Sequence, residues 1–320
     1  MLEAPFDIVE PQSGETPVLV EVPHAGLWLD AEAASYNLAP TRCIARDADL
    51  YVDELFVDSP SLGATFLFTR LSRYVVDLNR EADDIDGASV RGAPVRDRPR
   101  GVMWRLTSDG LPILREPLPE REYRRRIDCF HAPYHRAIQQ ILERKRERFG
   151  LAVMLCAHSM PSPRRFGPSS SPRLADLVPG TRGRTSADAR FIDRVDRVGR
   201  DRGYRVQHDI PYRGGFSTTH YGRPKDGVHA IQLEIARRLY MDEETLGRRD
   251  GDFERVRELA REMVSALVEE ATAAAGAGLP REASVEPRRG GLRKRRLGRH
   301  APHTLLVRAS VAARRPHHHV

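Results

Sequence analysis

The sequence contains few cysteines and no long apolar run, and both absences narrow the class of protein. Three cysteines occur among 320 residues, at Cys43, Cys129 and Cys156. They lack the close paired spacing of a disulfide framework or of a cysteine-type zinc site, which predicts a reducing compartment. No stretch approaches the roughly 18 apolar residues that a membrane-spanning helix needs. We therefore expect neither a disulfide-stabilised secreted domain nor a membrane protein.

A secretory signal is also missing from the start of the sequence. Residues 1–7, Met-Leu-Glu-Ala-Pro-Phe-Asp, contain neither the basic segment nor the apolar segment that a signal peptide combines. Together with the cysteine usage, this predicts a cytoplasmic protein. The length is enough for one large α/β domain or two ordinary ones, and a hydrophobic content of 40% can form a sizeable core.

The net charge of +7 does not describe the whole chain. Residues 281–320 contain 11 lysines and arginines and 2 acidic residues, a local balance of +9, so the other 280 residues together carry −2. From residue 276 the sequence also loses any periodic apolar pattern. We predict a globular domain over residues 1–275 and a basic, disordered extension over residues 276–320. Either the extension contacts nucleic acid or acidic partners by charge alone, or it is an unselected tail.

Two apolar runs each end in a histidine. Residues 151–157 and 17–22 have the composition of strands buried on both faces, as in the parallel sheets of α/β proteins, and His158 and His24 follow them. Ligands bind at the carboxyl ends of strands in open α/β sheets, and a catalytic zinc takes three protein ligands. We predict that both histidines hold one metal ion at the top of a sheet. The alternative is that each merely ends a strand and bonds a loop.

Acidic residues supply candidates for a third ligand and for a base. Asp47 and Asp49 lie in residues 46–56, where a helix is predicted, so either one turns inward to the metal or both cap that helix. Glu234 lies among apolar residues in a predicted strand over residues 228–235. A buried glutamate is rare unless it is paired or functional, and beside a metal it would serve as a general base. The alternative is an ion pair with an arginine that follows the strand.

Residues 73–80, Arg-Tyr-Val-Val-Asp-Leu-Asn-Arg, place an amide and a cation after a short predicted strand over residues 74–76. Arg80 is suited to bidentate capture of a carboxylate, and Asn79 can add a fixed amide donor. The irregular residues 81–118 predict a long loop, of the kind that serves as a lid or binds substrate. The paired glycines 214–215 would let the backbone approach a ligand closely.

His131 and His135 lie four residues apart in a predicted helix or helix pair over residues 119–148. This spacing could bind metal, but the pair lacks the adjacent glutamate of a metalloprotease motif. We interpret both as core or substrate-contact residues. Further helices are predicted over residues 187–202 and 253–274.

These motifs together resemble the N-formylglutamate amidohydrolase family, and the resemblance keeps its order from about residue 10 to residue 270. The family looks like a branch of the zinc carboxypeptidase and aspartoacylase group. The resemblance implies a three-layer α/β/α sandwich with a mixed, mostly parallel sheet, one zinc ion, an Asn-Arg pair on the substrate carboxylate and a glutamate base. The matching segments are Pro23-His24-Ala25-Gly26, Asp47-Ala48-Asp49, residues 72–80, Ala157-His158-Ser159, Gly214-Gly215, His220-Tyr221-Gly222 and Gln232-Leu233-Glu234.

Carried over by position, the resemblance makes His24 and His158 zinc ligands. In the related peptidases the third ligand is a glutamate three residues after the first histidine, but that position here is Leu27. We expect Asp49 to replace it, with Asp47 as the second candidate. Cys156 is a further departure, because the resemblance predicts an acid there, two residues before His158.

The same transfer assigns the substrate-binding and catalytic groups. Asn79 and Arg80 would hold the substrate carboxylate, and Glu234 would be the base. Arg73 or His220 would help the metal to stabilise the oxyanion, and Gly215 would lie against the substrate.

The implied reaction is metal-dependent hydrolysis of an N-formyl or other small N-acyl amino acid, with N-formyl-L-glutamate giving L-glutamate and formate. Zinc, or another divalent ion, would be the cofactor. The alternatives are a zinc-dependent deacylase of a different N-acyl amino acid or small peptide, and a non-catalytic binding relative.

Overall fold

The computed structural model describes residues 5–12, 14–162 and 175–278. The extension predicted from residue 276 lies outside the described residues, apart from 276–278, which continue the last helix. Residues 163–174 also lie outside the described residues.

A six-stranded mixed sheet forms the centre of the described chain, with the order β1-β3-β2-β4-β6-β5. The four inner strands run parallel to one another, and the edge strands β1 and β5 are antiparallel to their neighbours. This confirms the predicted mixed, mostly parallel sheet. The strands are β1 (Phe6–Val9), β2 (Val18–Val22), β3 (Thr65–Thr69), β4 (Ala152–Met160), β5 (Leu177–Gly180) and β6 (Val228–Ala236).

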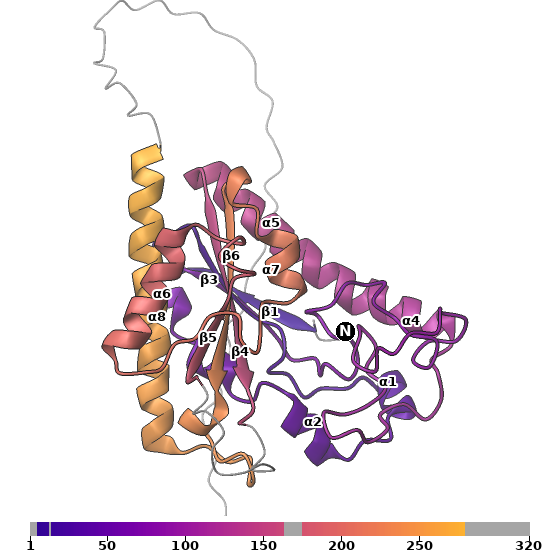
Figure 1. The fold of residues 1–320 in the computed structure, drawn as a ribbon. Coiled ribbons are helices and arrows are strands. Elements are labelled where there is room, and N and C mark those ends of the chain that lie inside the picture. The colour runs from indigo at the N-terminus through magenta and orange to yellow at the C-terminus, as the bar shows by residue number, and fades with distance from the viewer. Residues whose placement is uncertain (1–4, 13, 163–174, 279–320) are drawn as a thin grey trace, which may run out of the picture. The chain divides into compact units, whose positions relative to one another are not determined.

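Helices cover both faces of the sheet (Figure 1). Alternate side chains of β4 show why, since Val153 and Leu155 pack into one apolar core and Met154 and Cys156 into the other. The first core lies under α6 and α8 and the second under α5, so the predicted three-layer sandwich is confirmed. The α-helices are α1 (Ala31–Tyr36), α2 (Thr41–Asp47), α3 (Val52–Leu55), α4 (Glu120–Arg126), α5 (Ala132–Phe149), α6 (Ala189–Asp201), α7 (Phe216–Tyr221) and α8 (Asp250–Gly278).

Shorter helical turns complete the list of elements. A π-helical segment, η2 (Ile127–His131), joins α4 to α5. The 3-10 turns are η1 (Ser59–Leu62), η3 (Pro224–Asp226) and η4 (Arg237–Leu239). Among the described residues no helix is both long and apolar enough to cross a membrane.

The continuous helix predicted over residues 46–56 is wrong. The helix α2 ends at Asp47 and α3 begins at Val52, because Ala48 is extended and Tyr51 is left-handed with φ 67°. Asp49 lies in the linker between them, where its backbone N–H donates to the carbonyl of His24 at 2.9 Å. This break turns the side chain of Asp49 away from a helix surface and toward the end of β2.

The strand predicted over residues 74–76 is also wrong, because these residues form a turn. The buried guanidinium of Arg126 donates to the carbonyls of Tyr74 (3.4 Å) and Val75 (3.0 Å), so these carbonyls are not available to a sheet. Further along the chain, Val206 forms only an isolated parallel bridge with Leu177. The irregular loop over residues 81–118 is confirmed, since it contains only isolated bridges and turns.

Candidate active site and metal centre

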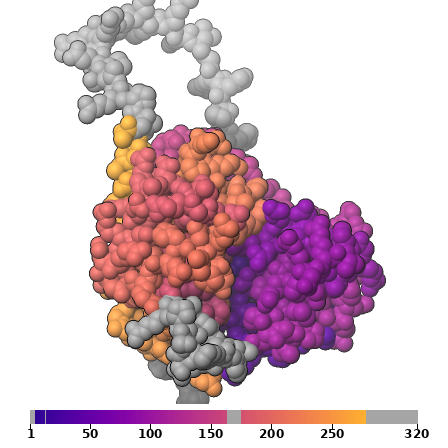
Figure 2. Space-filling view, in the orientation of Figure 1, coloured from indigo at the N-terminus to yellow at the C-terminus, as the bar shows by residue number. Residues whose placement is uncertain are grey.

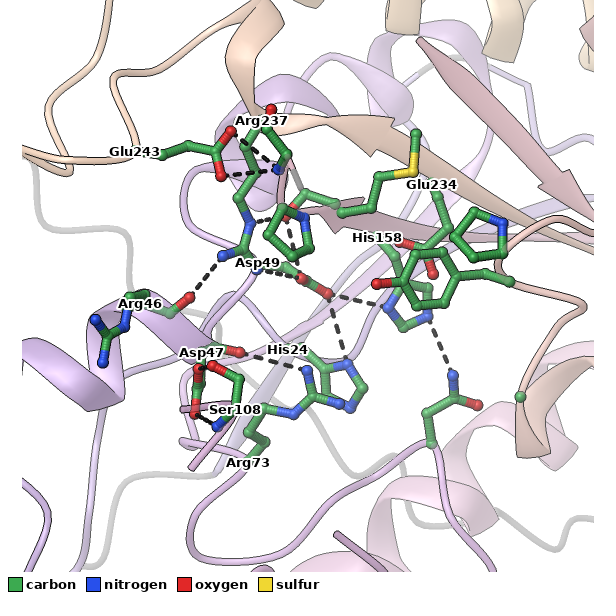
Figure 3. Close-up of a pocket in the computed structure, with 18 of the residues that line it drawn as sticks. His24, Arg46, Asp47, Asp49, Arg73, Ser108, His158, Glu234, Arg237 and Glu243 are labelled. Atoms are coloured by element: carbon green, nitrogen blue, oxygen red, sulfur yellow. Dashed lines mark hydrogen bonds and ion pairs between the residues drawn. The ribbon is translucent and has the colours of Figure 1, made fainter. Parts of the chain in front are cut away.

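Two histidines and one aspartate from separate elements come together at the carboxyl end of the sheet. His24 follows β2, Asp49 lies between α2 and α3, and His158 is part of β4. The Oδ2 atom of Asp49 lies 3.5 Å from Nδ1 of His24 and 3.0 Å from Nδ1 of His158. All three side chains are buried and point toward one another (Figure 3). The predicted set of His24, Asp49 and His158 therefore forms one cluster.

The atoms of this cluster fit a divalent metal ion. The ligand atoms lie within 4.8 Å of one another. Nδ1 of His24 is buried and has no hydrogen-bond partner among the described residues, which is an unusual state for a polar atom in a protein core. Two imidazole nitrogens and one carboxylate oxygen are also the type of set that holds catalytic zinc. The group could therefore bind a metal ion.

Asp77 fixes which nitrogen of His24 faces the cluster. Its Oδ1 lies 2.9 Å from His24 Nε2, and its Oδ2 accepts from Arg73 at 2.8 Å and from the indole of Trp104 at 2.9 Å. Burial opposes the charge of Asp77, but Arg73 and His24 outweigh it and hold the pKa of this carboxyl well below its usual range. An ionised partner on the outer nitrogen is typical of metal-binding histidines.

The second oxygen of Asp49 is held by two donors. Oδ1 accepts from Ser159 Oγ at 3.1 Å and from Arg237 Nη2 at 3.2 Å. Burial would raise the pKa of Asp49, but the hydrogen bond with His158 and the nearby ring of His24 keep it well below its usual value. The carboxylate is therefore ionised and fixed in direction, as a metal ligand needs to be.

Asp47, the second candidate for the acidic ligand, has other partners. Its carboxylate accepts from Tyr74 Oη at 2.6 Å and from the backbone N–H of Ser108 at 2.9 Å, and it also contacts the Ser108 hydroxyl. These bonds join the end of α2 to the irregular loop. Asp47 lines the same cavity but lies outside the cluster of His24, Asp49 and His158.

Glu234 lies beside the cluster on the neighbouring strand. It stands opposite His158 in the register of β4 and β6, and it is 5% exposed. Its Oε1 accepts from Gln232 Nε2 at 2.8 Å. Burial raises the pKa of this carboxyl, although the charge of His158 and the Gln232 bond oppose the rise.

The alternative ion pair for Glu234 is not formed in the described chain. Arg237 contacts Asp49, and Arg238 contacts Asp176 at 2.6 Å. Glu234 has no lysine or arginine partner among the described residues, and its carboxylate lines the cavity.

A cavity of about 1750 Å³ joins these groups. The space-filling view shows a groove between the purple part of the surface, which includes the loop over residues 81–118, and the salmon and orange part beside it (Figure 2). The predicted residues Asn79, Arg80, Arg73 and Gly215 line the cavity together with the cluster and Glu234. His220 does not line it. That ring stacks on Phe216 in α7, with ring centroids 4.7 Å apart.

The two arginines predicted to bind substrate, Arg73 and Arg80, have different partners. Arg73 is paired with Asp77 and lies over the Trp104 ring at 4.4 Å. Arg80 donates only to backbone carbonyls, those of Arg100 at 3.1 Å and Asn79 at 3.4 Å, and has no carboxylate partner among the described residues. Arg80 therefore keeps a positive charge that no described carboxylate neutralises, as do Arg42, Arg100 and Arg213 in the same cavity.

The donors of Asn79 face protein groups. Its Nδ2 lies 3.2 Å from Gln232 Oε1 and 3.3 Å from His158 Nε2, and its Oδ1 accepts from the backbone N–H of Ser217 at 2.9 Å. Gly215 is required here, because a Cβ atom at this position would lie 2.4 Å from Asn79 Nδ2. The glycine backbone therefore lies close to Asn79, whereas the sequence predicted a close approach to a ligand.

The sequence analysis did not predict the contacts that Trp104, Ser108 and Gln232 make at the site. Trp104 and Ser108 lie in an irregular loop, where no periodic pattern indicates which side chains turn inward. Gln232 carried a usable signal, since residues two apart in a strand share a face and Glu234 had already been singled out.

Comparison with known proteins agrees with this geometry. A family model described as N-formylglutamate amidohydrolase matches residues 16–241. Two curated relatives are named N-formylglutamate deformylase. The one from Pseudomonas aeruginosa is 33% identical over 82% of this chain and 96% of its own length, and the one from Pseudomonas putida is 34% identical over 72% and 84%.

A solved structure supports the same assignment. The N-formylglutamate amidohydrolase from Ralstonia eutropha is 30% identical, with a TM-score of 0.77 over 85% of this chain and 99% of that one. The sequence matches and the fold therefore agree, and the chain belongs to the N-formylglutamate amidohydrolase family.

Proposed function

We propose that the protein hydrolyses the amide bond of an N-formyl amino acid, with N-formyl-L-glutamate as substrate and L-glutamate and formate as products. The names of the curated relatives support the substrate. The observation that carries the proposal is the convergence of His24, Asp49 and His158 beside the unpaired carboxylate of Glu234 in one cavity. We assign this activity to residues 1–275 and none of it to residues 276–320.

We propose zinc as the metal and Asp49 as its acidic ligand. When bound, a zinc ion acts as a Lewis acid that polarises an amide carbonyl and lowers the pKa of water. Two imidazoles and an ionised carboxylate suit this ion, and a fourth position would remain for the reacting groups. Arg73 contributes through Asp77, which holds His24 in direction.

Glu234 is the proposed general base. It removes a proton from the attacking water and delivers it to the leaving amine, roles that suit a carboxyl whose pKa is raised by burial. Arg80 binds the substrate carboxylate and so fixes the amide relative to Glu234, which makes the attack effectively unimolecular. The unpaired charge of Arg80 supports this role.

Release of formate tests the proposal. Purified protein should hydrolyse N-formyl-L-glutamate, contain about one zinc per chain and lose activity to a chelator in a way that zinc restores. Absence of formate release from zinc-loaded protein would overturn the proposed function. The presence of zinc without turnover would instead favour a non-catalytic binding relative.

The size of the cavity favours one second candidate. Ligand pockets commonly span roughly 300 to 1,000 Å³, and this cavity is larger, at about 1750 Å³. A larger N-acyl group or a short peptide would therefore fit. Side-by-side kcat/KM values for formyl-, acetyl- and succinyl-glutamate decide between the two candidates.

A cytoplasmic location is also proposed. Its support is the state of the cysteines, since Cys43, Cys129 and Cys156 are all free thiols. Cell fractionation with an antibody to the protein tests it.

A further inference from the structure

Gln232 is a buried amide directly beside the proposed base. It lies two residues before Glu234 in β6, so both side chains project from the same face of the sheet. Gln232 is 4% exposed, and its Nε2 donates to Glu234 Oε1 at 2.8 Å. Among the described residues, this is the only hydrogen bond that the carboxylate of Glu234 receives from a side chain.

Two donors fix the orientation of the Gln232 amide. The backbone N–H of Gly215 lies 2.8 Å from Gln232 Oε1, and Asn79 Nδ2 lies 3.2 Å from the same atom. A backbone N–H can only donate, so the atom that faces Gly215 is the oxygen. The NH₂ group of Gln232 must then face Glu234.

Asn79 is oriented in the same way. The backbone N–H of Ser217 donates to its Oδ1 at 2.9 Å, so its NH₂ group faces Gln232. The backbone N–H groups of Gly215 and Ser217, at the start of α7, thus set the direction of both amides. Gly215 has no side chain, which leaves room for the amide of Asn79 to pack against it. The result is a continuous hydrogen-bonded path from α7 to the carboxylate of Glu234.

We propose that Gln232 is a positioning residue for this reaction. Its N–H donor holds Oε1 of Glu234 and leaves Oε2 to exchange a proton with the attacking water. The inference rests on the proposed function, in which Glu234 is the base. A charge-assisted hydrogen bond to a buried carboxylate limits its side-chain rotamers, and fixing such groups is what outer residues do for a catalytic constellation.

The competing explanation is that Gln232 only holds the segment over residues 215–217 in place. Gln232→Glu separates the two, because the new carboxylate has nearly the same shape and still accepts from Gly215 and Asn79. It loses the donor to Glu234 and also adds a negative charge beside that carboxylate. Gln232→Met loses both the acceptor and the donor but adds no charge. A role limited to the loop predicts that the glutamate variant resembles wild type apart from the effect of this added charge, which disappears when Glu234 is replaced by alanine.

The experiment measures kcat and KM for formate release by both variants, with zinc content and the far-UV spectrum as checks on the fold. Positioning predicts that kcat falls by about 10- to 100-fold in Gln232→Glu as well as in Gln232→Met, while zinc content is unchanged. KM should stay within about threefold, because the substrate carboxylate is bound elsewhere. The matched control is Gln207→Glu, since Gln207 lines the same cavity and forms no side-chain hydrogen bond in the described chain.

A double-mutant cycle with Glu234→Ala distinguishes a positioning role of Gln232 from a purely structural one. Without the carboxylate there is nothing for Gln232 to hold, so Gln232→Met should cost no further residual activity in that background. An additional loss there, or wild-type kcat in Gln232→Glu, would overturn the inference. Either result would leave wild-type formate release intact, so this failure differs from failure of the proposed function.

Discussion

The two ring nitrogens of His24 have different surroundings, and this difference depends on one carboxylate. Nε2 is hydrogen-bonded to Asp77, whereas Nδ1 has no hydrogen-bond partner in the described part of the chain and lies 3.5 Å from Asp49 Oδ2. Asp77 is itself held by Arg73 and Trp104, so its position is fixed before any ion arrives. The orientation of the His24 ring toward the cluster therefore depends on a residue outside that cluster.

Replacement of this carboxylate tests that dependence. Asp77→Asn should weaken zinc binding by about 10- to 100-fold, because the ring of His24 loses the ionised partner that orients it. Competition with a chromophoric chelator measures the affinity. Asp47→Asn is the matched control, since Asp47 is also buried and lines the cavity but lies outside the cluster. Equal zinc affinity in Asp77→Asn and wild type would contradict this role.

Glu234 gives a second prediction at the level of a single residue. Glu234→Gln should keep zinc and substrate binding but lose about 10²- to 10⁴-fold in kcat, the range typical of a lost general base. Steady-state kinetics and metal analysis of the same preparation check both parts. Glu243→Gln serves as the control, because Glu243 lines the cavity but accepts from the backbone of Ser162. Near-wild-type turnover in Glu234→Gln would remove the proposed base.

A group of histidines lies where η2 and the start of α5 meet α7. The rings of His131 and His135 lie 4.3 Å apart between centroids, and Phe216 of α7 packs on both. Nε2 of His131 also lies 2.9 Å from the backbone carbonyl of Arg80, so the histidine group contacts the proposed substrate-binding residue. Burial first, then the neighbouring His131 and His220, lower the pKa of His135 to about 3.

This packing predicts a sensitivity to acid. His135 stays neutral in the folded protein down to about pH 3, whereas the unfolded chain binds the proton near pH 6.5, so the unfolded state holds more protons between these values. The free energy of unfolding should therefore fall as the pH falls below about 6.5. His135→Gln should remove up to about 2 kcal/mol of the loss between pH 6.5 and pH 5. Urea unfolding of both proteins at the two pH values measures it, and an identical loss in the variant would contradict the assignment.

Elements with apolar side chains on both faces could be predicted from the sequence, and half-exposed ones could not. The strands β2, β4 and β6 are fully buried, so their residues form continuous apolar runs that end at the site. The edge strand β1 is half exposed and short, and β5 contains Pro179, so neither gives a strand pattern. The two histidines of the cluster could be predicted for the same reason, since His24 follows the buried strand β2 and His158 lies near the end of β4.

The remaining site residues depend on contacts between distant segments. Asp49 faces His158 only because the chain leaves the helical conformation at Ala48, and no local pattern marks that break. Trp104 reaches Asp77 from an irregular loop. In both cases the structure is decided by tertiary hydrogen bonds, which propensity and periodicity do not contain.

At the scale of the whole molecule, residues 1–279 form one compact unit by themselves. Every residue proposed here for metal, substrate or proton transfer lies within it. A chain ending at residue 279 should therefore retain zinc content and kcat/KM, whereas its net charge loses the +9 carried by residues 281–320. Parallel assays of both chains measure this, and loss of turnover on truncation would show that the extension belongs to the catalytic machinery.

The same truncation tests the role of the basic extension. If the full chain binds DNA, that binding should weaken steeply as salt rises and should be absent after truncation, because it depends on counterion release from phosphates. Binding that survives truncation would locate a nucleic-acid surface on residues 1–279.

The three donors of the metal cluster are delivered by segments that emerge from the ribosome at very different times. His24 and Asp49 appear early, but His158 belongs to the central strand β4, which must pair with β2 before its ring can face the other two. We therefore expect the ion to be a late arrival in the biogenesis of this protein, captured by a sheet that has already formed. If the ion is zinc, as proposed, its shortage in the cell should then yield folded but inactive protein rather than degraded protein.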